Sequence, residues 1–381
     1  MTSRFKLPPL SLYIHIPWCV RKCPYCDFNS HQAGQSIPEA AYVNALLADF
    51  EQELPRVQGR KLESIFFGGG TPSLFSVQAI DKILSRINAL TPFSPTIETT
   101  LEANPGTFEQ DKFSDFRQAG INRLSIGIQS FNDSHLKTLG RIHSSADAIS
   151  AINMAIDSGF INFNLDLMHG LPNQSTSEAL SDLARAFEFQ PTHLSWYQLT
   201  IEPNTVFFSH PPRLPKEDTL AEIEDAGKKL LTEQGLHQYE VSAYSKPDKE
   251  SRHNLNYWQF GDYLGIGAGA HGKITMLDDR QVIRTSKTRL PKSYLDPGKN
   301  FLGKKVVIPA DQLAGEFFMN ALRLNKGFNV ELFESRTGLP IKAFQAKVLQ
   351  AEKQGLLVNG ETILPTEKGR LFLNDLVGIF V

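Results

Sequence analysis

The stretch IPWCVRKCPYCDFN, residues 16–29, holds every cysteine of this 381-residue chain: Cys19, Cys23 and Cys26. Thiolates are soft ligands that select zinc, copper(I) or iron–sulfur clusters. A [4Fe–4S] cube ordinarily takes four cysteines, one for each iron, so three thiolates with no fourth would leave one iron open to an external ligand. A zinc ion would instead need a Cys3His set completed by His15 or His31. Both interpretations remain open on spacing alone.

The composition is that of an ordinary globular protein. Apolar residues make up 41% and charged residues 21%, and the net charge of −2 gives no excess of positive charge for a nucleic-acid partner. Residues 1–18 lack the apolar core and cleavage site of a secretion signal, and no run approaches the ~18 apolar residues of a membrane span. We therefore expect a cytoplasmic protein, where clustered cysteines are usually metal ligands or redox groups.

Short β-branched or aromatic runs alternate with amphipathic helical patterns along most of the chain. The runs predicted as strands are SLYIHI (11–16), ESIFFG (63–68), IETTLEA (97–103), NRLSIGIQ (122–129), INFNLDLM (161–168), HLSWYQL (193–199) and YEVSAY (239–244). Residues 38–54 are typical of the helices between them, with apolar side chains at every fourth position. Strands that alternate with helices favour parallel βαβ units. We predict an α/β fold, a partial (β/α)6 TIM-like barrel, with a doubly wound open sheet as the structural alternative.

Polar and glycine-rich segments follow several predicted strands at the point where each strand ends. The cysteines follow the first strand, GGGTP (68–72) the second, NPGT (104–107) the third and HGLP (169–172) the fifth. The carboxyl ends of parallel strands meet at one edge of the sheet, where such folds carry their chemistry. We therefore expect these loops to surround one site.

The pattern changes toward the C-terminus. Residues 291–310 are rich in Pro, Gly and Lys and are predicted as a linker between a core of residues 1–290 and a domain of residues 311–381. That domain shows helical patterns and then an alternating stretch with Asn359-Gly360 at its turn, which is typical of a hairpin. Helices followed by a small hairpin resemble a winged helix. We expect a packing or lid role for it, because it lacks a dense basic face.

The motif C-x3-C-x2-C after the first strand, with Tyr25 before the last cysteine, resembles the radical S-adenosylmethionine (SAM) superfamily. Further stretches resemble its oxygen-independent coproporphyrinogen dehydrogenase family: GGGTPS (68–73), LEANPGT (101–107), SIGIQSFND (125–133), LGRIH (139–143) and LDLMHGLP (165–172). The resemblance covers most of residues 10–272. It implies a [4Fe–4S] cluster on the three cysteines, with SAM chelating the open iron and a 5′-deoxyadenosyl radical formed when SAM is cleaved.

The resemblance also implies which residues meet SAM. Members of the family place aromatic rings beside it, glycine backbone and a hydroxyl against its amino group, and polar side chains at its ends. The residues implied in this way are Tyr13, Tyr25, Gly69, Gly70, Thr71, Glu102, Gln129, Arg141, Asp166, Gln198 and His271. Gln198 and His271 take the positions that contact the adenine. His271 belongs to GAGAHG (267–272), which lacks the βαβ unit and acidic partner of a dinucleotide site and is predicted as a strand-end turn.

Two features depart from the dehydrogenases. Their cysteine motif continues with x-C, where this chain has Asp27-Phe28, and they carry an N-terminal extension for which Cys19 comes too early. Residues 253–258 instead read H-N-x-x-Y-W. This hexamer, together with Phe28, resembles the haem chaperone branch of the family.

The branch resemblance implies a haem site at His253, Tyr257 and Trp258. The imidazole of His253 is an iron ligand at neutral pH, Tyr257 is a second candidate ligand, and both aromatic rings offer flat faces to a porphyrin. The alternative from the residues alone is that His253 caps a turn while the two rings fill the core.

The implied function is that of a haem chaperone that binds haem and passes it to an acceptor haemoprotein, such as a respiratory enzyme at the inner face of the membrane. The loaded protein would then be peripheral to that membrane. Cleavage of SAM is left open, and it would require a small-protein electron donor. The enzymatic alternative is an oxygen-independent coproporphyrinogen III dehydrogenase, and a zinc-stabilised interaction protein is a third class. The sequence indicates no oligomeric state.

Overall fold

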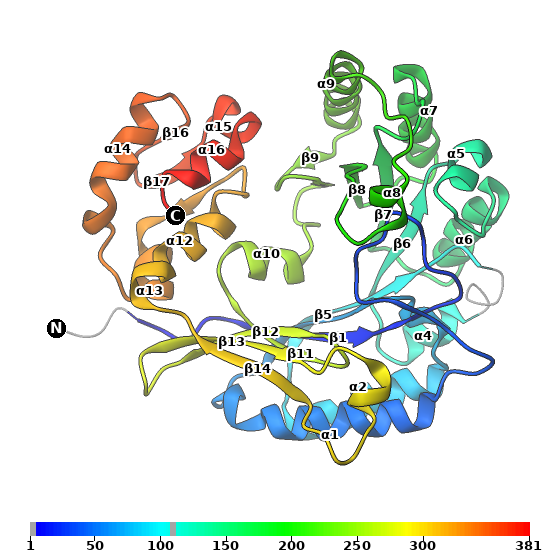
Figure 1. Cartoon of the computed structure of the whole chain (residues 1–381), viewed down its shortest axis with the longest axis horizontal. Coiled ribbons are helices and arrows are strands. Elements are labelled where there is room, and N and C mark those ends of the chain that lie inside the picture. The colour runs from blue at the N-terminus through cyan, green and yellow to red at the C-terminus, as the bar shows by residue number, and fades with distance from the viewer. Residues whose placement is uncertain (1–4, 107–111) are drawn as a thin grey trace.

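The computed structural model describes residues 5–106 and 112–381 and arranges them around one large sheet (Figure 1). Twelve of the described strands form this sheet, in the order β14-β13-β12-β11-β1-β4-β5-β6-β7-β8-β10-β9. Neighbours from β11 through β1 and β4 to β8 pair in parallel, and the pairs toward both edges are antiparallel. The sheet remains open, since β14 and β9 are its two edges.

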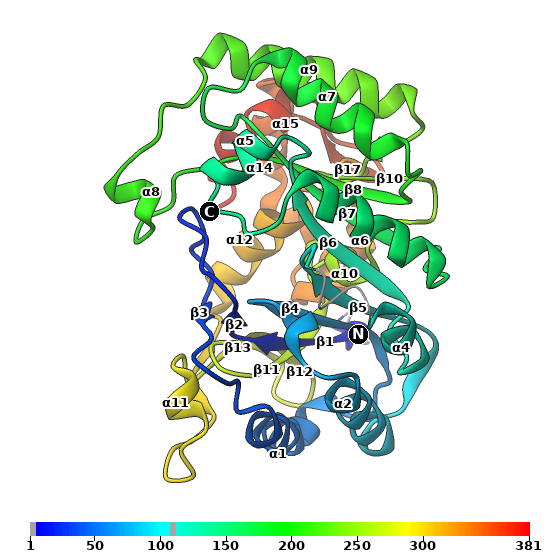
Figure 2. The same ribbon diagram turned by 90° about the vertical axis from the view of Figure 1, so that its right-hand side faces the viewer.

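Six βα units form the parallel part of the sheet and confirm the predicted α/β fold. Their strands are β1 (Leu10–Ile16), β4 (Leu62–Gly69), β5 (Phe93–Ala103), β6 (Arg123–Gln129), β7 (Phe163–His169) and β8 (His193–Gln198). The helices that follow them are α1 (Glu39–Val57), α2 (Val77–Leu90), α4 (Phe113–Gln118), α5 (Asp133–Thr138), α6 (Ser145–Asp157), α7 (Thr176–Phe187), α8 (Val206–Ser209) and α9 (Glu217–Glu233). Most of these helices lie along the outer side of the curved sheet, whereas the short α8 lies among the loops at its carboxyl edge (Figures 1 and 2).

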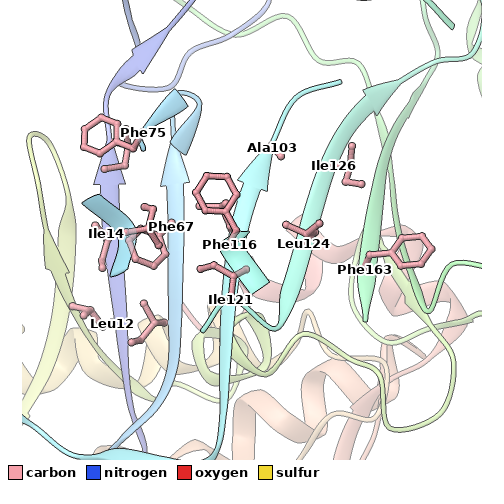
Figure 3. Close-up of a cluster of buried hydrophobic side chains, with 14 of the residues drawn as sticks. Leu12, Ile14, Phe67, Phe75, Ala103, Phe116, Ile121, Leu124, Ile126 and Phe163 are labelled. Atoms are coloured by element: carbon pink, nitrogen blue, oxygen red, sulfur yellow. The ribbon is translucent and has the colours of Figure 1, made fainter. Parts of the chain in front are cut away.

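The main core lies between the parallel strands and this outer layer of helices. In β1, Leu12 and Ile14 are fully buried and lie beside Phe67 of β4, as Figure 3 shows. Helix α1 begins after Pro38 and presents Leu46 and other apolar side chains to the strands, as the spacing of four predicts. Burial of such side chains stabilises the fold by ~1.5–3 kcal/mol each, so the sheet is a rigid base for the loops at its carboxyl edge.

The two antiparallel edges of the sheet differ from what the sequence predicts. The seventh predicted strand, residues 239–244, is replaced by β9 (His237–Gln238) and β10 (Ala243–Ser245), and β10 runs antiparallel to β8. Residues 291–310, predicted as a linker, hold α11 (Pro291–Tyr294) and β14 (Leu302–Val307), which pairs with β13 (Gln281–Lys287). The exposed lysines of β14 suit an edge strand and give it the appearance of a linker in the sequence.

Strands β11, β12 and β13 were not predicted at all. Strand β11 (Asp262–Ile266) pairs in parallel with β1, and β12 (His271–Met276) returns antiparallel to it. The GAGAHG stretch forms the turn between them, with positive φ at Gly267 and Gly269. The expected strand-end turn is therefore present, and it brings His271 to the first position of β12.

The C-terminal elements follow the order of a winged helix. They are α12 (Ala310–Ala321), β15 (Phe328–Asn329), α13 (Val330–Thr337), the 3-10 turn η2 (Ile341–Phe344), α14 (Gln345–Lys353), β16 (Leu357–Val358), β17 (Thr362–Pro365), α15 (Glu367–Leu371) and α16 (Leu373–Gly378). Residues 359–361 connect β16 to the antiparallel β17, as the predicted hairpin requires. Together with α10 (Arg252–Trp258), these elements lie on the side of β11–β13 opposite α1 (Figure 1). Phe260, Val282 and Phe317 join the two parts in one apolar cluster.

Candidate functional site

The three cysteines lie on one loop between β1 and α1. Strands β2 (Trp18–Cys19) and β3 (His31–Gln32) pair across the base of this loop, and Lys22 Nζ donates to the carbonyl oxygens of Phe28 and Ser30 within it. The loop extends toward α8, where the amide of Phe207 donates to the carbonyl oxygen of Pro24 (Figure 2). All three thiols are free and partly exposed. Burial raises the pKa of the Cys19 thiol to about 11.

The glycine run after β4 is joined to the cysteine loop through its backbone. The amide of Gly70 donates to the carbonyl oxygen of Ile16, and the amide of Thr71 donates to that of Trp18, both at 2.7 Å. A Cβ on Gly70 would lie 2.5 Å from the Trp18 carbonyl oxygen, so only glycine fits here. Both amides are therefore already hydrogen-bonded within the protein. An ammonium group donates hydrogen bonds only, so the atoms of this run that suit it are carbonyl and hydroxyl oxygens.

Two partly buried carboxyl groups, Glu102 and Asp166, lie within β5 and β7. Glu102 accepts a hydrogen bond from the amide of Gly69 at 3.1 Å, and burial, with a smaller contribution from Asp166, raises its pKa to about 8. Asp166 accepts from Ser125 Oγ at 3.0 Å and from Asn164 Nδ2 at 2.9 Å, and burial also raises its pKa. The charge of Asp166 and the poor solvation of both groups thus disfavour ionisation of Glu102.

Arg141 links the cysteine loop to the strand ends. Its guanidinium donates to Cys23 Sγ at 3.6 Å and to the carbonyl oxygen of Gly127 at 2.9 Å, while its Nε has no partner among the described residues. Gln129 ends β6 with a φ of +69° and accepts a hydrogen bond from Tyr197 Oη at 2.8 Å. The free Nε of Arg141 leaves a buried donor for an anionic ligand group.

These side chains line one cavity of about 380 Å³, which we call the cysteine cavity. Its lining includes the predicted residues Cys19, Cys23, Cys26, Tyr25, Gly69, Gly70, Thr71, Glu102, Gln129, Arg141, Asp166 and Trp258. No three His, Cys, Asp or Glu side chains of the described ranges surround a single metal-ion position. A cube binds each thiolate through a different iron, so the cysteines fit a cluster better than one zinc ion. The predicted zinc ligand His15 is also engaged, with Tyr13 Oη at 3.0 Å and the Asn29 carbonyl oxygen at 2.9 Å.

A second and larger cavity, of about 800 Å³, adjoins the cysteine cavity and is called the aromatic cavity below. Tyr13, Tyr257 and His271 line it rather than the cysteine cavity, whereas Trp258 lines both. Phe28, Gly69 and Glu102 are also shared by both linings. Gln198 is exposed at the end of β8 and lies in neither lining, so the structure does not bring it to the predicted site.

His253 does not occupy the position that the sequence predicts for a haem ligand. Its side chain is 1% exposed, and its Nδ1 and Nε2 are hydrogen-bonded to Ser64 Oγ and Tyr257 Oη, each at 2.9 Å. Burial, together with the positive charge of Arg123, lowers its pKa to about 3, so the imidazole is neutral. Both nitrogens are thus occupied, and iron could reach His253 only if one of these hydrogen bonds broke.

Several site residues were missed by sequence reasoning. Asn104 donates from Nδ2 to Thr71 Oγ1 at 2.8 Å and lines the cysteine cavity, and Ser125 and Tyr197 hold Asp166 and Gln129. Asn104 lies in LEANPGT, so its place after β5 was a signal that could have identified it. The last residue of that motif, Thr107, lies outside the described residues.

Two stretches of the chain match known families: residues 13–186 match the Radical SAM superfamily and residues 308–372 the HemN C-terminal domain. Among solved structures, the chain is similar to coproporphyrinogen III oxidase (HemN) from Escherichia coli, described as a radical SAM enzyme. The TM-score is 0.83 at 24% identity, covering 99% of this chain and 91% of that one. This likeness shows the fold. The fold and the three clustered cysteines together define a radical SAM protein with a HemN-type C-terminal domain.

Curated relatives narrow this class. The chain is 52% identical over 381 residues to the heme chaperone HemW of Haemophilus influenzae and 50% identical over 377 residues to that of Escherichia coli, with 99% of both chains covered in each case. It is 35% identical to the heme chaperone HemW of Bacillus subtilis, over 97% of this chain and 99% of that one. The chain belongs to the family of proteins named heme chaperone HemW.

Proposed function

We propose that this chain is a haem chaperone, which binds haem and passes it to an acceptor haemoprotein. The relatives named heme chaperone HemW support this role, and the aromatic cavity is the single observation that carries it. Its volume of about 800 Å³ lies within the ~300–1,000 Å³ typical of cofactor and small-molecule sites. The rings of Tyr257, Trp258 and Tyr263 line it, and flat apolar faces suit a porphyrin.

The resident groups of the cysteine cavity are proposed to be a [4Fe–4S] cluster and SAM. Cys19, Cys23 and Cys26 would hold three irons and leave the fourth for the amino and carboxylate groups of SAM. When bound, the cluster supplies this open iron and a single electron. The free Nε of Arg141 and the absence of a single-ion site among the described residues support this assignment.

The side chains around the open position have distinct roles in this proposal. The Glu102 carboxylate would accept a hydrogen bond from the iron-bound amino group of SAM, and Asp166 would accept from the ribose hydroxyls. Arg141 donates to the carboxylate of SAM and also holds Cys23, so it couples ligand binding to the cysteine loop. Tyr25 and Gln129 complete the walls.

The proposal for the haem site gives α10 a supporting role. Tyr257 and Trp258 present their rings to the aromatic cavity, and His253 fixes the Tyr257 hydroxyl from behind. Trp258 Nε1 has no partner among the described residues, so it offers one more buried donor to a ligand. The two cavities share Trp258, and this contact gives a physical route for SAM and haem to influence each other.

The proposed place of action is the cytoplasm, with haem delivered to an acceptor such as a membrane respiratory enzyme. None of the helices in the described ranges is long and apolar enough to cross a bilayer. In this proposal those helices would contact a membrane acceptor at its surface, without entering the bilayer. If SAM is cleaved, a small electron-donor protein is also required.

One anaerobic preparation tests the proposal against its alternatives. We expect about four iron and four sulfide per chain together with tight haem binding, and no conversion of coproporphyrinogen III when SAM and a reductant are supplied. Formation of vinyl groups in step with 5′-deoxyadenosine would establish the dehydrogenase instead. A colourless preparation that lacks acid-labile sulfide and contains zinc would establish the third class. Transfer is then measured as recovery of haem by an acceptor apoprotein across a size-exclusion column.

A further inference from the structure

The aromatic cavity has one free imidazole. His15 and His271 are the histidines in its lining, and both nitrogens of His15 are hydrogen-bonded within the protein. The imidazole of His271 makes no hydrogen bond or ion pair with the described residues and is exposed. Burial of part of the ring, with the nearby charge of Arg284, lowers its pKa, so it is neutral at cytoplasmic pH. A neutral, unoccupied imidazole is the form that ligates iron.

The backbone holds His271 firmly in place. It begins β12 and pairs with Ser286 of β13. A Cβ on Gly265 would lie 2.0 Å from the His271 carbonyl oxygen, so the two strands approach closely at this point. The side chain therefore starts from a rigid position rather than from a mobile loop. Rigid support is a requirement for a ligand that must meet a metal in one geometry.

The other candidate ligands of this cavity are already engaged. The hydroxyl of Tyr257 is bonded to His253, that of Tyr263 accepts from Arg284, and that of Tyr13 is bonded to His15. Lys273 is buried against Asp262 and the Phe260 carbonyl oxygen. The cysteines lie in the neighbouring cavity and belong to the proposed cluster.

We propose that His271 is the axial ligand of the haem iron in the aromatic cavity, and that His253 is a positioning residue that acts through Tyr257. This inference rests on the proposed haem chaperone function and specifies how that site holds its cargo. It reassigns His271 from the adenine of SAM to haem, because the side chain lines the cavity that the cysteines do not enter.

The charge at the mouth of the cavity fits the carboxylates of haem. Arg289 lines the cavity, is exposed, and donates only to Asn29 Oδ1, at 3.3 Å, with no acidic partner in the described ranges. Its remaining guanidinium nitrogens are available for a propionate. Arg284, by contrast, is already paired with Glu316. Haem would thus lie with its iron toward β12 and a propionate toward Arg289.

The test replaces the proposed ligand with one of a different type in the full chain carrying its cluster. Ferric haem is titrated into the wild type, His271→Met, His271→Ala, His253→Gln and the exposed control His237→Ala, with absorption and electron paramagnetic resonance spectra recorded for each. We expect both His271 variants to lose the nitrogen-ligand spectrum. His271→Ala should also weaken haem binding about tenfold or more, which equals about 1.4 kcal/mol. Added imidazole should restore the spectrum of His271→Ala.

The His253 variant distinguishes the roles of the two histidines in haem binding. His253→Gln should keep the wild-type ligand spectrum and lose affinity by up to about tenfold, as expected for a residue behind the ligand shell. The inference is overturned if His271→Met keeps the wild-type spectrum, and equally if His253→Gln alone abolishes the nitrogen signature. Failure of the wild type to bind haem would instead overturn the proposed function itself, so the two failures are distinguishable.

Discussion

The cysteine cavity and the aromatic cavity share a wall but are built in different ways. The first collects residues from short motifs that each belong to one βα unit: the cysteine loop, the glycine run at the end of β4, Glu102 of β5 and Asp166 of β7. The second is assembled from segments far apart in the chain, from Tyr13 through Tyr257 to Asn320 of α12. The residues of the proposed cluster and SAM site can therefore be recognised in short sequence motifs. The proposed haem site instead depends on how β11–β14 and the C-terminal helices pack.

The largest effect is expected from removal of one cysteine. Cys23→Ala should reduce iron and sulfide from about four per chain to near zero, because the cube loses one of its three protein ligands. Haem binding should persist, since Cys23 is outside the aromatic cavity. Iron, sulfide and haem are measured on one anaerobic preparation. Loss of both groups together would show that the cavities do not form independently.

The next largest effect is expected from a substitution of Lys287, which lines the aromatic cavity. Lys287 is buried there and is ion-paired with Asp49 and with Glu53, whose Oε1 lies 2.6 Å from Nζ. Lys287→Met leaves the buried Asp49 without its cation, while Glu53 keeps Arg56, and should reduce the free energy of unfolding by about 3–5 kcal/mol. Urea unfolding measures this change, with the exposed Lys304→Met as control. A change as small as that of the control would contradict the structural role given to this ion triad.

A smaller effect should be confined to the cysteine cavity. Glu102→Gln removes the carboxylate proposed to accept from the iron-bound amino group of SAM, and a charged hydrogen bond of this kind contributes about 1.5–3 kcal/mol. SAM affinity, measured by calorimetry on the cluster-loaded protein, should fall about tenfold to a hundredfold. Glu222→Gln, on the exposed face of α9, is the matched control. Unaltered SAM affinity in Glu102→Gln would exclude this carboxyl as the ammonium partner.

The smallest effect is a dependence of SAM affinity on pH. The pKa of Glu102 is raised to about 8 by burial, so the carboxyl is mostly protonated below that pH and must lose its proton before it can accept as a carboxylate from the amino group of SAM. The SAM amino group also loses a proton when it binds iron, so affinity should rise about tenfold more between pH 7 and pH 9 in the wild type than in Glu102→Gln, with additional proton release on binding at pH 7. Calorimetry in buffers of different ionisation enthalpy measures that release. Affinity that is flat across this range in the wild type, or that rises equally in Glu102→Gln, would contradict the assignment.

The sequence predicts the cysteine cavity well for a physical reason. Cys19, Gly70 and Glu102 lie at or just beyond the carboxyl ends of strands whose apolar runs are readable, and parallel strands bring such positions to one edge. Three residues predicted for that site do not line this cavity: Tyr13 and His271 line the aromatic cavity, and Gln198 is exposed at the end of β8. The alternation of strand and helix patterns in the sequence also predicts the six βα units of the open sheet.

The aromatic cavity could not be predicted in the same way. The motif H-N-x-x-Y-W names His253, but its burial depends on Ser64 of β4, 189 residues away. His271 carries no local signal for the second cavity, since its exposure there depends on the pairing of β11, β12 and β13. Strand β11 was missed because it is short and contains glycine, and β14 was taken for a linker because it has the exposed lysines of an edge strand.

The most direct test of two separate sites is a titration of haem with and without SAM. The cluster-loaded wild type is given one equivalent of SAM, and ferric haem is then added while bound SAM is followed by equilibrium dialysis. The account predicts that one haem binds per chain while SAM stays bound, and that His271→Met alters the haem spectrum but not SAM retention. Release of SAM in proportion to the haem added would contradict it, because both ligands would then occupy one cavity.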